Sequence, residues 1–385
     1  MINPFSFTGA RRIVFGNGSL LELAERVGDL RGKRPLVVMD KQLAGAGVGA
    51  QVANMFDKAR LKFVLFDAAE PEPRLELADE GAKVALKGKC DAVIGIGGGS
   101  TMDLAKAVAV LAANKGKAVD YLGLNNVPGP GLPMIMVPTT AGTGSEVTFT
   151  AVFVRKNLKK KEGMNSPYLY PDLALLDPML TLSLPSHPTA TTGIDALCHA
   201  IESYTSVNAS PMSELVSLEA IRLIAENLRT CVHNGNDIQA RENMLLGSLY
   251  AGLGLANAGV TAVHSLSYPL GGKFGIPHGL ANTIMLPAVM VYNLPGAHEK
   301  FAIVAEAMGE IIDNMSLREA AYQSVEAVDS LIEDCGIYST LKDFGIKEKD
   351  FPELAKVAMT VARPLANNPR TVTVEDAMAI YEDAF

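Results

Sequence analysis

The sequence has no excess of positive charge and no long apolar run. Its 385 residues carry a net charge of −8, and the longest basic run, Lys159-Lys160-Lys161, is expected to form a solvated loop. A nucleic acid or an anionic membrane would require a basic face, so neither is expected as a partner. No apolar stretch reaches the roughly 18 residues needed to cross a bilayer. The composition, with 48% hydrophobic and 20% charged residues, is that of a globular protein.

Cysteine is also scarce. The four cysteines are widely spaced and form no C-x-x-C pair; they are Cys90, Cys198, Cys231 and Cys335. This spacing provides no disulfide framework and fits a reducing compartment. The N-terminus lacks the basic and then apolar pattern of a secretory signal. We therefore expect a soluble protein of the cytoplasm.

Histidine is rare as well, yet three of the six histidines stand in short, distinctive patterns. These patterns are Gly193-Ile-Asp-Ala-Leu-Cys-His-Ala-Ile-Glu202, Val263-His264-Ser265 and Pro277-His278-Gly279. Asp195 and His199 stand four positions apart in a stretch without Pro or Gly, which places them on one helix face. A carboxylate and an imidazole one turn apart can bind the same cation.

These histidines have a second interpretation. Each one, taken alone, is also compatible with a hydrogen-bonded helix residue that binds no metal. Glu202, three positions after His199, is either a hydrogen-bond partner of a ligand or a surface glutamate, and the pattern favours the surface.

The first half of the chain alternates strands and helices. Strands are expected at residues 36–39, 63–66, 92–96 and 134–137, with helices at residues 49–59, 75–86 and 101–114 between them. This alternation predicts a mostly parallel, Rossmann-like sheet covered on both faces by helices.

After about Leu184 the pattern becomes helical. Helices are expected at residues 191–206, 212–228, 240–255, 262–270, 279–292, 299–307 and 317–334, with a last one from Val374. The sequence thus predicts an α/β nucleotide-binding domain over residues 1–184 and an all-α domain over residues 185–385.

A glycine-rich turn follows the third predicted strand. The segment Ala92-Val-Ile-Gly-Ile-Gly-Gly-Gly-Ser100 leads directly into a predicted helix. Glycines there leave backbone N–H groups open to a phosphate, and the positive end of the helix favours an anion. The turn matches neither G-x-G-x-x-G nor a Walker A loop. We expect both phosphate binding and a helix cap, with Ser100 as N-cap and Asp103 in a capping-box position.

Two further features follow predicted strands. The loop Val137-Pro-Thr-Thr-Ala-Gly-Thr-Gly-Ser-Glu146 concentrates hydroxyls where open α/β sheets bind ligands, although a hydrophilic linker is the alternative. Asp40 ends the first predicted strand. A carboxylate there can accept the hydroxyls of an adenosine ribose and would repel a 2′-phosphate, although an exposed turn aspartate is the competing interpretation.

Together these segments resemble the iron-containing, or group III, alcohol dehydrogenases. The resemblance runs from Phe15-Gly-Asn-Gly18 to the C-terminus and includes five motifs in the same order. These are Gly97-Gly-Gly-Ser-Thr-Met-Asp-Leu-Ala-Lys106, Pro138-Thr-Thr-Ala-Gly-Thr-Gly-Ser-Glu146, Ser166-Pro-Tyr-Leu-Tyr-Pro-Asp-Leu-Ala174, the segment from Gly193 to Glu202, and Ile276-Pro-His-Gly279. The resemblance implies a dehydroquinate synthase-like fold with a nucleotide-binding α/β domain and an all-helical domain. It also implies a homodimer or a larger homo-oligomer.

The resemblance implies a set of site residues. A divalent metal, Fe²⁺ with Zn²⁺ as the alternative, would be held by Asp195, His199, His264 and His278. The cofactor, NAD in preference to NADP, would contact Asp40, Gly98, Gly99, Ser100, Asp103, Thr139, Thr140, Thr143, Lys161 and Leu180. The activity implied is hydride transfer between a small primary alcohol or diol and nicotinamide, with the metal polarising the substrate oxygen.

Two positions depart from the family pattern. Many members carry a second histidine four residues after the third ligand, where this chain has Tyr268. A phenol with a pKa near 10 does not titrate at neutral pH as an imidazole does, so Tyr268 either passes a hydrogen bond or packs. Some relatives have an asparagine where this chain has Glu72, which leaves a cofactor contact there open.

Three alternative functions are compatible with parts of the sequence. The first is a relative acting on a hydroxy- or oxo-acid, such as a maleylacetate reductase or a transhydrogenase, with Lys273 as the carboxylate partner. The second is a lyase of the dehydroquinate synthase type, whose phosphorylated substrate would require more cations than the motifs supply. The third, a metal-free nucleotide-binding regulator, leaves the three histidine patterns unexplained.

Overall fold

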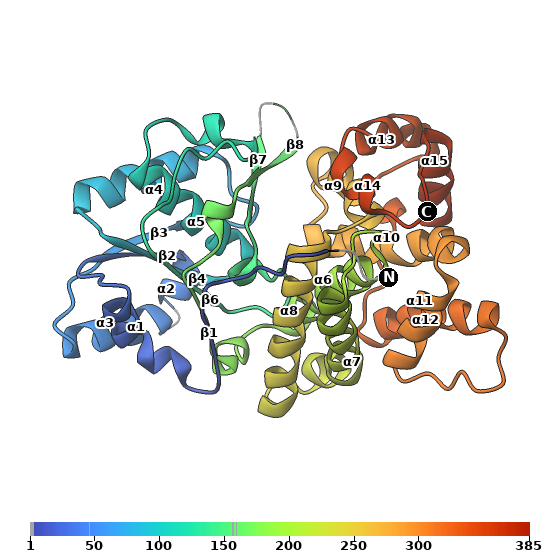
Figure 1. The fold of residues 1–385 in the computed structure, drawn as a ribbon, viewed down its shortest axis with the longest axis horizontal. Helices are drawn as coiled ribbons and strands as arrows, with labels where there is room; N and C mark the ends of the chain where they lie inside the picture. The colour runs from blue at the N-terminus through green and yellow to red at the C-terminus, as the bar shows by residue number, and fades with distance from the viewer. Residues whose placement is uncertain (1–3, 46, 156–157, 159) are drawn as a thin grey trace. The chain divides into compact units, whose positions relative to one another are not determined.

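The computed structural model describes residues 4–45, 47–155, 158 and 160–385 and divides into two compact units. The first unit comprises Gly9–Thr140 and Ser145–Thr181, drawn from blue to green in Figure 1. The second comprises Leu182–Phe385, Ala141–Gly144 and the described residues up to Thr8. A short piece of the hydroxyl-rich loop therefore belongs to the helical unit, although the chain on either side belongs to the α/β unit.

A parallel sheet of six strands forms the centre of the α/β unit. The strand order is β1-β9-β6-β4-β2-β3, and each neighbouring pair is parallel. The bounds are β1 Ile13–Phe15, β2 Pro35–Asp40, β3 Val64–Ala69, β4 Ala92–Gly97, β6 Met134–Pro138 and β9 Leu173–Leu176. The four strands expected from apolar runs are β2, β3, β4 and β6, and their prediction is confirmed. Strands β1 and β9, at one end of the strand order, are not predicted from the sequence.

Alternate residues of the strands enter two separate cores, because successive side chains point to opposite faces of a sheet. Leu36 and Val38 of β2 belong to one core, whereas Val37 and Met39 belong to the other. The first core includes α4 (Glu76–Gly88) and α5 (Gly99–Ala113), and the second includes α1 (Leu23–Asp29) and α3 (Val48–Lys58). Figure 1 shows these helices on the two faces of the sheet.

A smaller sheet accompanies the main one. Its order is β5-β8-β7, with β5 at Gly123–Leu124, β7 at Thr150–Arg155 and β8 at Lys160–Asn165. The prediction of a solvated loop for the basic run is therefore wrong for Lys160 and Lys161, which begin β8 and pair with β7. Lys159 lies outside the described residues. The polar strand pairs along its whole length with β7, whose Ala151 and Phe153 are fully buried.

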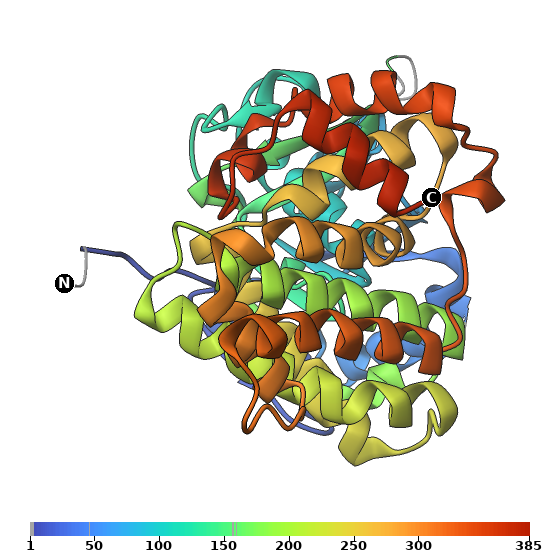
Figure 2. The ribbon, with the colours of Figure 1, turned by 90° about the vertical axis from the view of Figure 1, so that its right-hand side faces the viewer.

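The second unit is helical throughout its longer elements, as Figure 2 shows, and its buried side chains form one large core. The bounds are α6 Ser186–Thr205, α7 Pro211–His233, α8 Ile238–Ala258, α9 Ala262–Phe274, α10 His278–Asn293, α11 His298–Ala307, α12 Leu317–Asp334, α13 Phe351–Ala358, α14 Ala362–Asn367 and α15 Val374–Asp383. The helical character expected after residue 184 is confirmed. The boundary between residues 184 and 185 stays a prediction.

Proline explains where the helices differ from expectation. Helix α6 begins at Ser186, five residues before its predicted start, because Pro188 lies in the first turn, where a missing N–H costs nothing. Helices α9 and α10 continue through Pro269 and Pro287. The predicted end of α9, just after Pro269, is therefore too early, and the short helices α13 and α14 are not predicted from the sequence.

No single helix among the described residues has both the length and the apolar character required to span a membrane. Helices α8 and α9 meet that criterion only as a joined pair, and the chain bends by 103° between them.

Candidate metal centre and cofactor site

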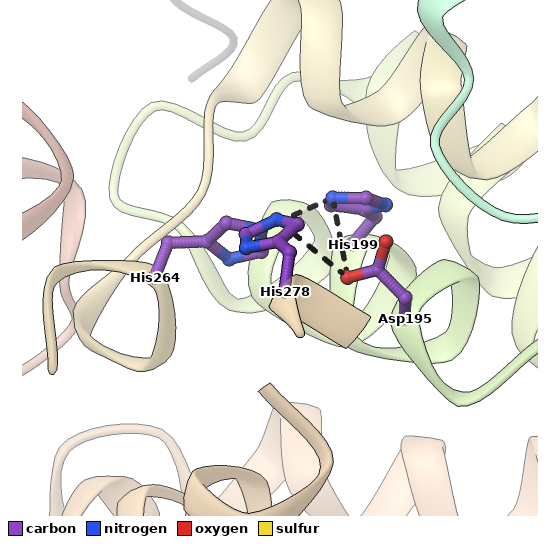
Figure 3. A group of neighbouring side chains, drawn as sticks. All are labelled: Asp195, His199, His264 and His278. Carbon is purple, nitrogen blue, oxygen red and sulfur yellow. Dashed lines mark hydrogen bonds and ion pairs between the residues drawn. The ribbon is translucent and has the colours of Figure 1, made fainter. Parts of the chain in front are cut away.

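The structure brings Asp195, His199, His264 and His278 together in the helical unit. Asp195 and His199 stand on α6, His264 on the first turn of α9, and His278 at the start of α10, as Figure 3 shows. One ligand atom from each residue lies within 4.8 Å of the others. Asp195 and His199 thus share one helix, as the sequence predicts, and α9 and α10 supply the other two residues of the group.

A hydrogen bond at Nδ1 fixes the tautomer of His199 and that of His264. Nδ1 of His199 lies 3.3 Å from the carbonyl oxygen of Gly142, to which it donates. Nδ1 of His264 donates to the Glu202 carboxylate. The Nε2 atoms of the two histidines lie 3.1 Å apart and both present lone pairs. Two facing lone pairs repel unless a proton or a cation lies between them.

Glu202 is a buried partner of the site, and the expectation of a surface glutamate is wrong. Only 2% of this residue is exposed. One carboxylate oxygen accepts hydrogen bonds from the backbone N–H groups of Thr261 and Val263 and from the Thr261 hydroxyl, at 2.8–2.9 Å. The other accepts from His264. Glu202 therefore caps the positive N-terminus of α9 and also orients His264 of that helix.

The electrostatics of the site favour an ionised Asp195 carboxylate beside the three imidazoles. Burial alone would raise the pKa of Asp195, but the three nearby histidines and the Asn282 amide lower it overall. Burial lowers the pKa of His199. Burial also opposes a charge on His264, yet the charge and hydrogen bond of Glu202 raise the pKa of that imidazole. An anionic Asp195 and a neutral His199 are the forms that bind a metal.

This donor set fits a divalent cation. Three imidazole nitrogens and one carboxylate oxygen are ligands for Fe²⁺ and Zn²⁺. A cation among them would resolve the lone-pair repulsion between His199 and His264. The hydrogen bond from His264 to a carboxylate is the outer partner that metal-binding histidines usually have.

Two other residues of α9, Tyr268 and Lys273, are not among the proposed metal ligands. The ring of Tyr268 lies edge-on to His264, with centroids 6.3 Å apart, and its centroid is 5.9 Å from that of His278. Lys273, at the far end of α9, has its Nζ 2.6 Å from Glu353 and 3.8 Å from Asp350. The one lysine among the described residues of α9 and α10 is therefore already paired with two carboxylates.

The glycine-rich turn leads from β4 into α5 as expected, but its cap differs. The N-cap is Gly98 without a side-chain hydrogen bond, so the capping box predicted for Ser100 and Asp103 is wrong. Asp103 instead accepts hydrogen bonds from the Ser145 hydroxyl at 2.6 Å and from the Val152 N–H at 2.9 Å. The first N–H groups of α5 have no intrahelical acceptor and remain suited to a phosphate. A cofactor contact by Asp103 stays a prediction.

Several predicted cofactor residues lie at the carboxyl ends of adjacent strands. Asp40 ends β2, Gly98 follows β4, and Thr139 and Thr140 follow β6. The chain passes from β2 outward to β3 and then returns to place β4 on the other side of β2. Ligands of open α/β sheets bind at such a switch point, so this edge supports a dinucleotide site. One Asp40 oxygen accepts from the Leu43 N–H at 2.8 Å.

The remaining predicted cofactor residues are distributed around this edge and beyond it. The Nζ atom of Lys161 lies 2.6 Å from a Glu72 carboxylate oxygen. The Glu72 N–H donates to the Ser100 hydroxyl at 3.1 Å, which ties this pair to the glycine-rich turn. Leu180 packs against the core on the α1 and α3 face. Thr143 lies in the segment that belongs to the helical unit.

Sequence reasoning missed three groups of the metal centre. The Gly142 carbonyl has no side-chain signal. Asn282 stands one helical turn after His278, and its amide nitrogen lies 2.7 Å from Oδ1 of Asp195. That spacing was the only available signal. The sequence places Glu202 on the same helix face as His199 but favours a surface position, because the burial of Glu202 depends on α9.

Comparison with known proteins identifies one family. Residues 10–178 match the family model described as iron-containing alcohol dehydrogenase, and residues 189–385 match the C-terminal model of the Fe-containing alcohol dehydrogenase family. The long-chain-alcohol dehydrogenase 1 of Geobacillus thermodenitrificans is 43% identical over 383 residues, covering 97% of this chain and 96% of that protein.

Two solved structures are similar over nearly their full length. A crystal structure of 1,3-propanediol oxidoreductase has a TM-score of 0.96 and 37% identity, with both chains covered completely. A sulfoacetaldehyde reductase from Bifidobacterium kashiwanohense in complex with NAD⁺ has a TM-score of 0.88 and 29% identity, with 99% of each chain covered. The chain belongs to the iron-containing alcohol dehydrogenase family.

Proposed function

We propose that this protein is an NAD-linked, iron-dependent alcohol dehydrogenase that interconverts a small primary alcohol or diol and its aldehyde. The observation that carries the proposal is the pair of Nε2 atoms of His199 and His264, whose lone pairs face each other at 3.1 Å beside the Asp195 carboxylate. The family relationship supports the same activity. No protein nucleophile is required, because hydride passes directly between substrate and nicotinamide.

The proposed ligands are Asp195, His199, His264 and His278. When bound, Fe²⁺ supplies Lewis-acid polarisation of the substrate oxygen, and Zn²⁺ is the alternative ion. Asp195 contributes one negative charge among three imidazoles, so the donor set does not neutralise a divalent ion completely. The Gly142 carbonyl and Glu202 keep Nε2 of His199 and His264 directed into the site.

The proposed cofactor is NAD in preference to NADP. The uncapped N-terminus of α5 offers backbone N–H groups of Gly98, Gly99 and Ser100 to the pyrophosphate. Asp40 is proposed to accept the ribose hydroxyls and to exclude a 2′-phosphate by charge repulsion. Thr139, Thr140, Thr143, Lys161, Leu180 and Asp103 complete the proposed set of cofactor residues.

The proposed substrate is uncharged. Lys273, the one lysine or arginine among the described residues of α9 and α10 themselves, is held by Glu353 and Asp350. A hydroxyacid or a sugar phosphate would meet no free cation among the described residues of these two helices. This favours an alcohol or diol over a hydroxyacid, and over the phosphorylated substrate of a lyase.

We also propose a homodimer or larger homo-oligomer, as the resemblance implies, and a cytoplasmic location. The four cysteines are all free, which supports a reducing compartment. The division into domains at residues 184 and 185 is proposed on the same sequence grounds.

The decisive experiment incubates Fe²⁺-loaded protein without oxygen in the presence of NAD⁺ or NADP⁺. The panel contains primary alcohols of increasing length, diols and hydroxyacids, and reduced cofactor is followed by absorbance. We expect turnover with alcohols or diols and NAD⁺. Silence with every alcohol, together with silence in aldehyde reduction, would overturn the proposal.

His264→Ala tests the ligand assignment separately. We expect the variant to lose both bound iron and turnover, because one ligand and the partner of Glu202 are removed together. His298→Ala, on α11, is the matched control and should retain both properties. Activity that survived His264→Ala would show that the ligand assignment is wrong.

A further inference from the structure

Asn282 lies among the proposed metal ligands without being one of the predicted residues. It stands on α10, one turn after His278, and is fully buried. Its amide nitrogen lies 2.7 Å from Oδ1 of Asp195, 3.1 Å from Nε2 of His264 and 3.3 Å from Nε2 of His278. One side chain therefore reaches three of the four ligand atoms.

The contact with Asp195 selects one carboxylate oxygen. Oδ1 is the oxygen that lies 3.9 Å from Nε2 of both His199 and His278. The terminal torsion of an aspartate is broad, so an unrestrained carboxylate would present either oxygen. An amide N–H that donates to Oδ1 restricts this rotation and keeps that oxygen directed toward the imidazoles.

The orientation of the amide follows from its neighbours. With the amide reversed, its carbonyl oxygen would face Oδ1 at hydrogen-bond distance, and two acceptors would repel. In the observed orientation Oδ1 of Asn282 is buried and has no hydrogen-bond partner among the described residues. A buried carbonyl without a partner costs free energy, so stability alone does not account for asparagine here.

The close approach of α10 to α6 adds to the argument. A Cβ atom on Gly279 would lie 2.7 Å from the carbonyl oxygen of Thr191, so only glycine lets the helices meet at this level. One turn further along α10, Asn282 bridges to Asp195 on α6. The bridge joins the helix that carries His278 to the helix that carries Asp195 and His199.

We propose that Asn282 is a positioning residue of the metal centre. Its amide holds Oδ1 of Asp195 toward the imidazoles and fixes α10 against α6, so that Asp195 and His278 close on the cation together. This inference rests on the proposed metal site.

The test measures metal binding rather than turnover. Asn282→Leu replaces the amide by an apolar side chain of similar length, and Asn282→Ala serves if the leucine variant does not fold. Co²⁺ is titrated into metal-free protein, its visible absorption is recorded, and affinity is measured by competition with a chelator. We expect affinity to fall by about 10- to 100-fold, as for other partners of metal ligands, and the Co²⁺ spectrum to change because the carboxylate is no longer held.

Thr283→Val is the matched control. Thr283 is the next residue on α10, is equally buried, and donates only to the Gly279 carbonyl. We expect this variant to bind Co²⁺ with wild-type affinity and spectrum. Melting of each metal-free protein shows whether a loss of affinity reflects the site or the fold.

The outcomes are distinct. Wild-type affinity and spectrum in both Asn282 variants would overturn the inference and leave the metal site intact. An equal loss in Thr283→Val would also overturn it, because helix packing would then be the cause. A wild-type protein that bound neither Co²⁺ nor Fe²⁺ would overturn the metal site itself, and the inference with it.

Discussion

Glu202 accepts a hydrogen bond from Nδ1 of His264 with one carboxylate oxygen and caps the helix that carries His264 with the other. One buried anion therefore sets both the position of the helix and the direction of the imidazole. In Glu202→Gln an amide NH2 group replaces one carboxylate oxygen. This group is a donor, and it would face the hydrogen-bond donors of Thr261 or of His264. We expect metal affinity to fall by about 10- to 100-fold, measured by competition with a chelator. The exposed Glu299→Gln on α11 should bind metal as the wild type does.

Asp40 provides a test of cofactor choice. In Asp40→Asn the side-chain oxygen can still accept from the Leu43 N–H in the first turn of α2 (Lys41–Gly45), but the charge that would repel a 2′-phosphate is absent. We expect the ratio of kcat/KM for NAD⁺ to that for NADP⁺ to fall by about tenfold or more, which corresponds to about 1.4 kcal/mol. Asp57→Asn, exposed on α3, is the control. An unchanged ratio would remove Asp40 from the cofactor site.

Glu146 predicts a pH dependence of stability. This carboxyl is fully buried near Lys106, and burial raises its pKa to about 7. The unfolded chain releases the proton near the ordinary value of about 4.5, so the folded state loses relative stability as pH rises from about 5 to 7. We expect the loss to amount to roughly 3 kcal/mol, at about 1.4 kcal/mol for each pKa unit.

The measurement compares urea unfolding of the wild type and Glu146→Gln between about pH 5 and pH 8. Glutamine cannot ionise, so the difference between the two proteins should change across this interval and become constant above it. Parallel stability curves would show that Glu146 does not titrate in this range.

Gly279 is expected to accept no side chain. In Gly279→Ala the new Cβ would lie 2.7 Å from the Thr191 carbonyl oxygen and push α10 away from α6. We expect a loss of about 1–3 kcal/mol in the free energy of unfolding and weaker metal binding, because His278 moves with α10. Gly28→Ala, at an exposed glycine of α1 with open space around it, should cost nothing. Thermal melting and a chelator titration measure the two effects.

Tyr268 is expected to contribute through its ring. Tyr268→Phe keeps the ring that lies against His264 and His278, so it should keep the metal content and leave the dependence of kcat/KM on pH unchanged between about pH 6 and 8. Tyr268→His should add an inflection near about pH 6.5. A changed profile in the phenylalanine variant would show that the hydroxyl takes part in proton transfer.

Much of the fold follows from patterns in the sequence, and the exceptions have physical causes. The apolar runs of β2, β3, β4 and β6 are long enough to be read as buried strands. Strand β8 carries Lys160, Lys161 and Glu162, and its pairing with β7 and β5 makes it a strand. Strand β1 is three residues long, which is too short for its side-chain alternation to be read.

The candidate site also has residues that the sequence predicts and residues whose role depends on the fold. The four proposed metal ligands stand in local motifs, so the sequence predicts them, and the fold brings them together. The partners behind them depend on tertiary packing. Glu202 becomes buried only because the first turn of α9 packs over it, and Asn282 meets Asp195 only because α10 approaches α6 closely. No local pattern contains that information.

The proposed ligands come from helices that are distant along the chain, since α7, α8 and α9 separate Asp195 from His278. An ion held by all four would close a long loop of the folded chain, and because it binds only the folded state it would stabilise that state. A nascent chain has the complete donor set only after α10 has left the ribosome. If these four residues hold the ion, metal loading therefore follows the synthesis of His278.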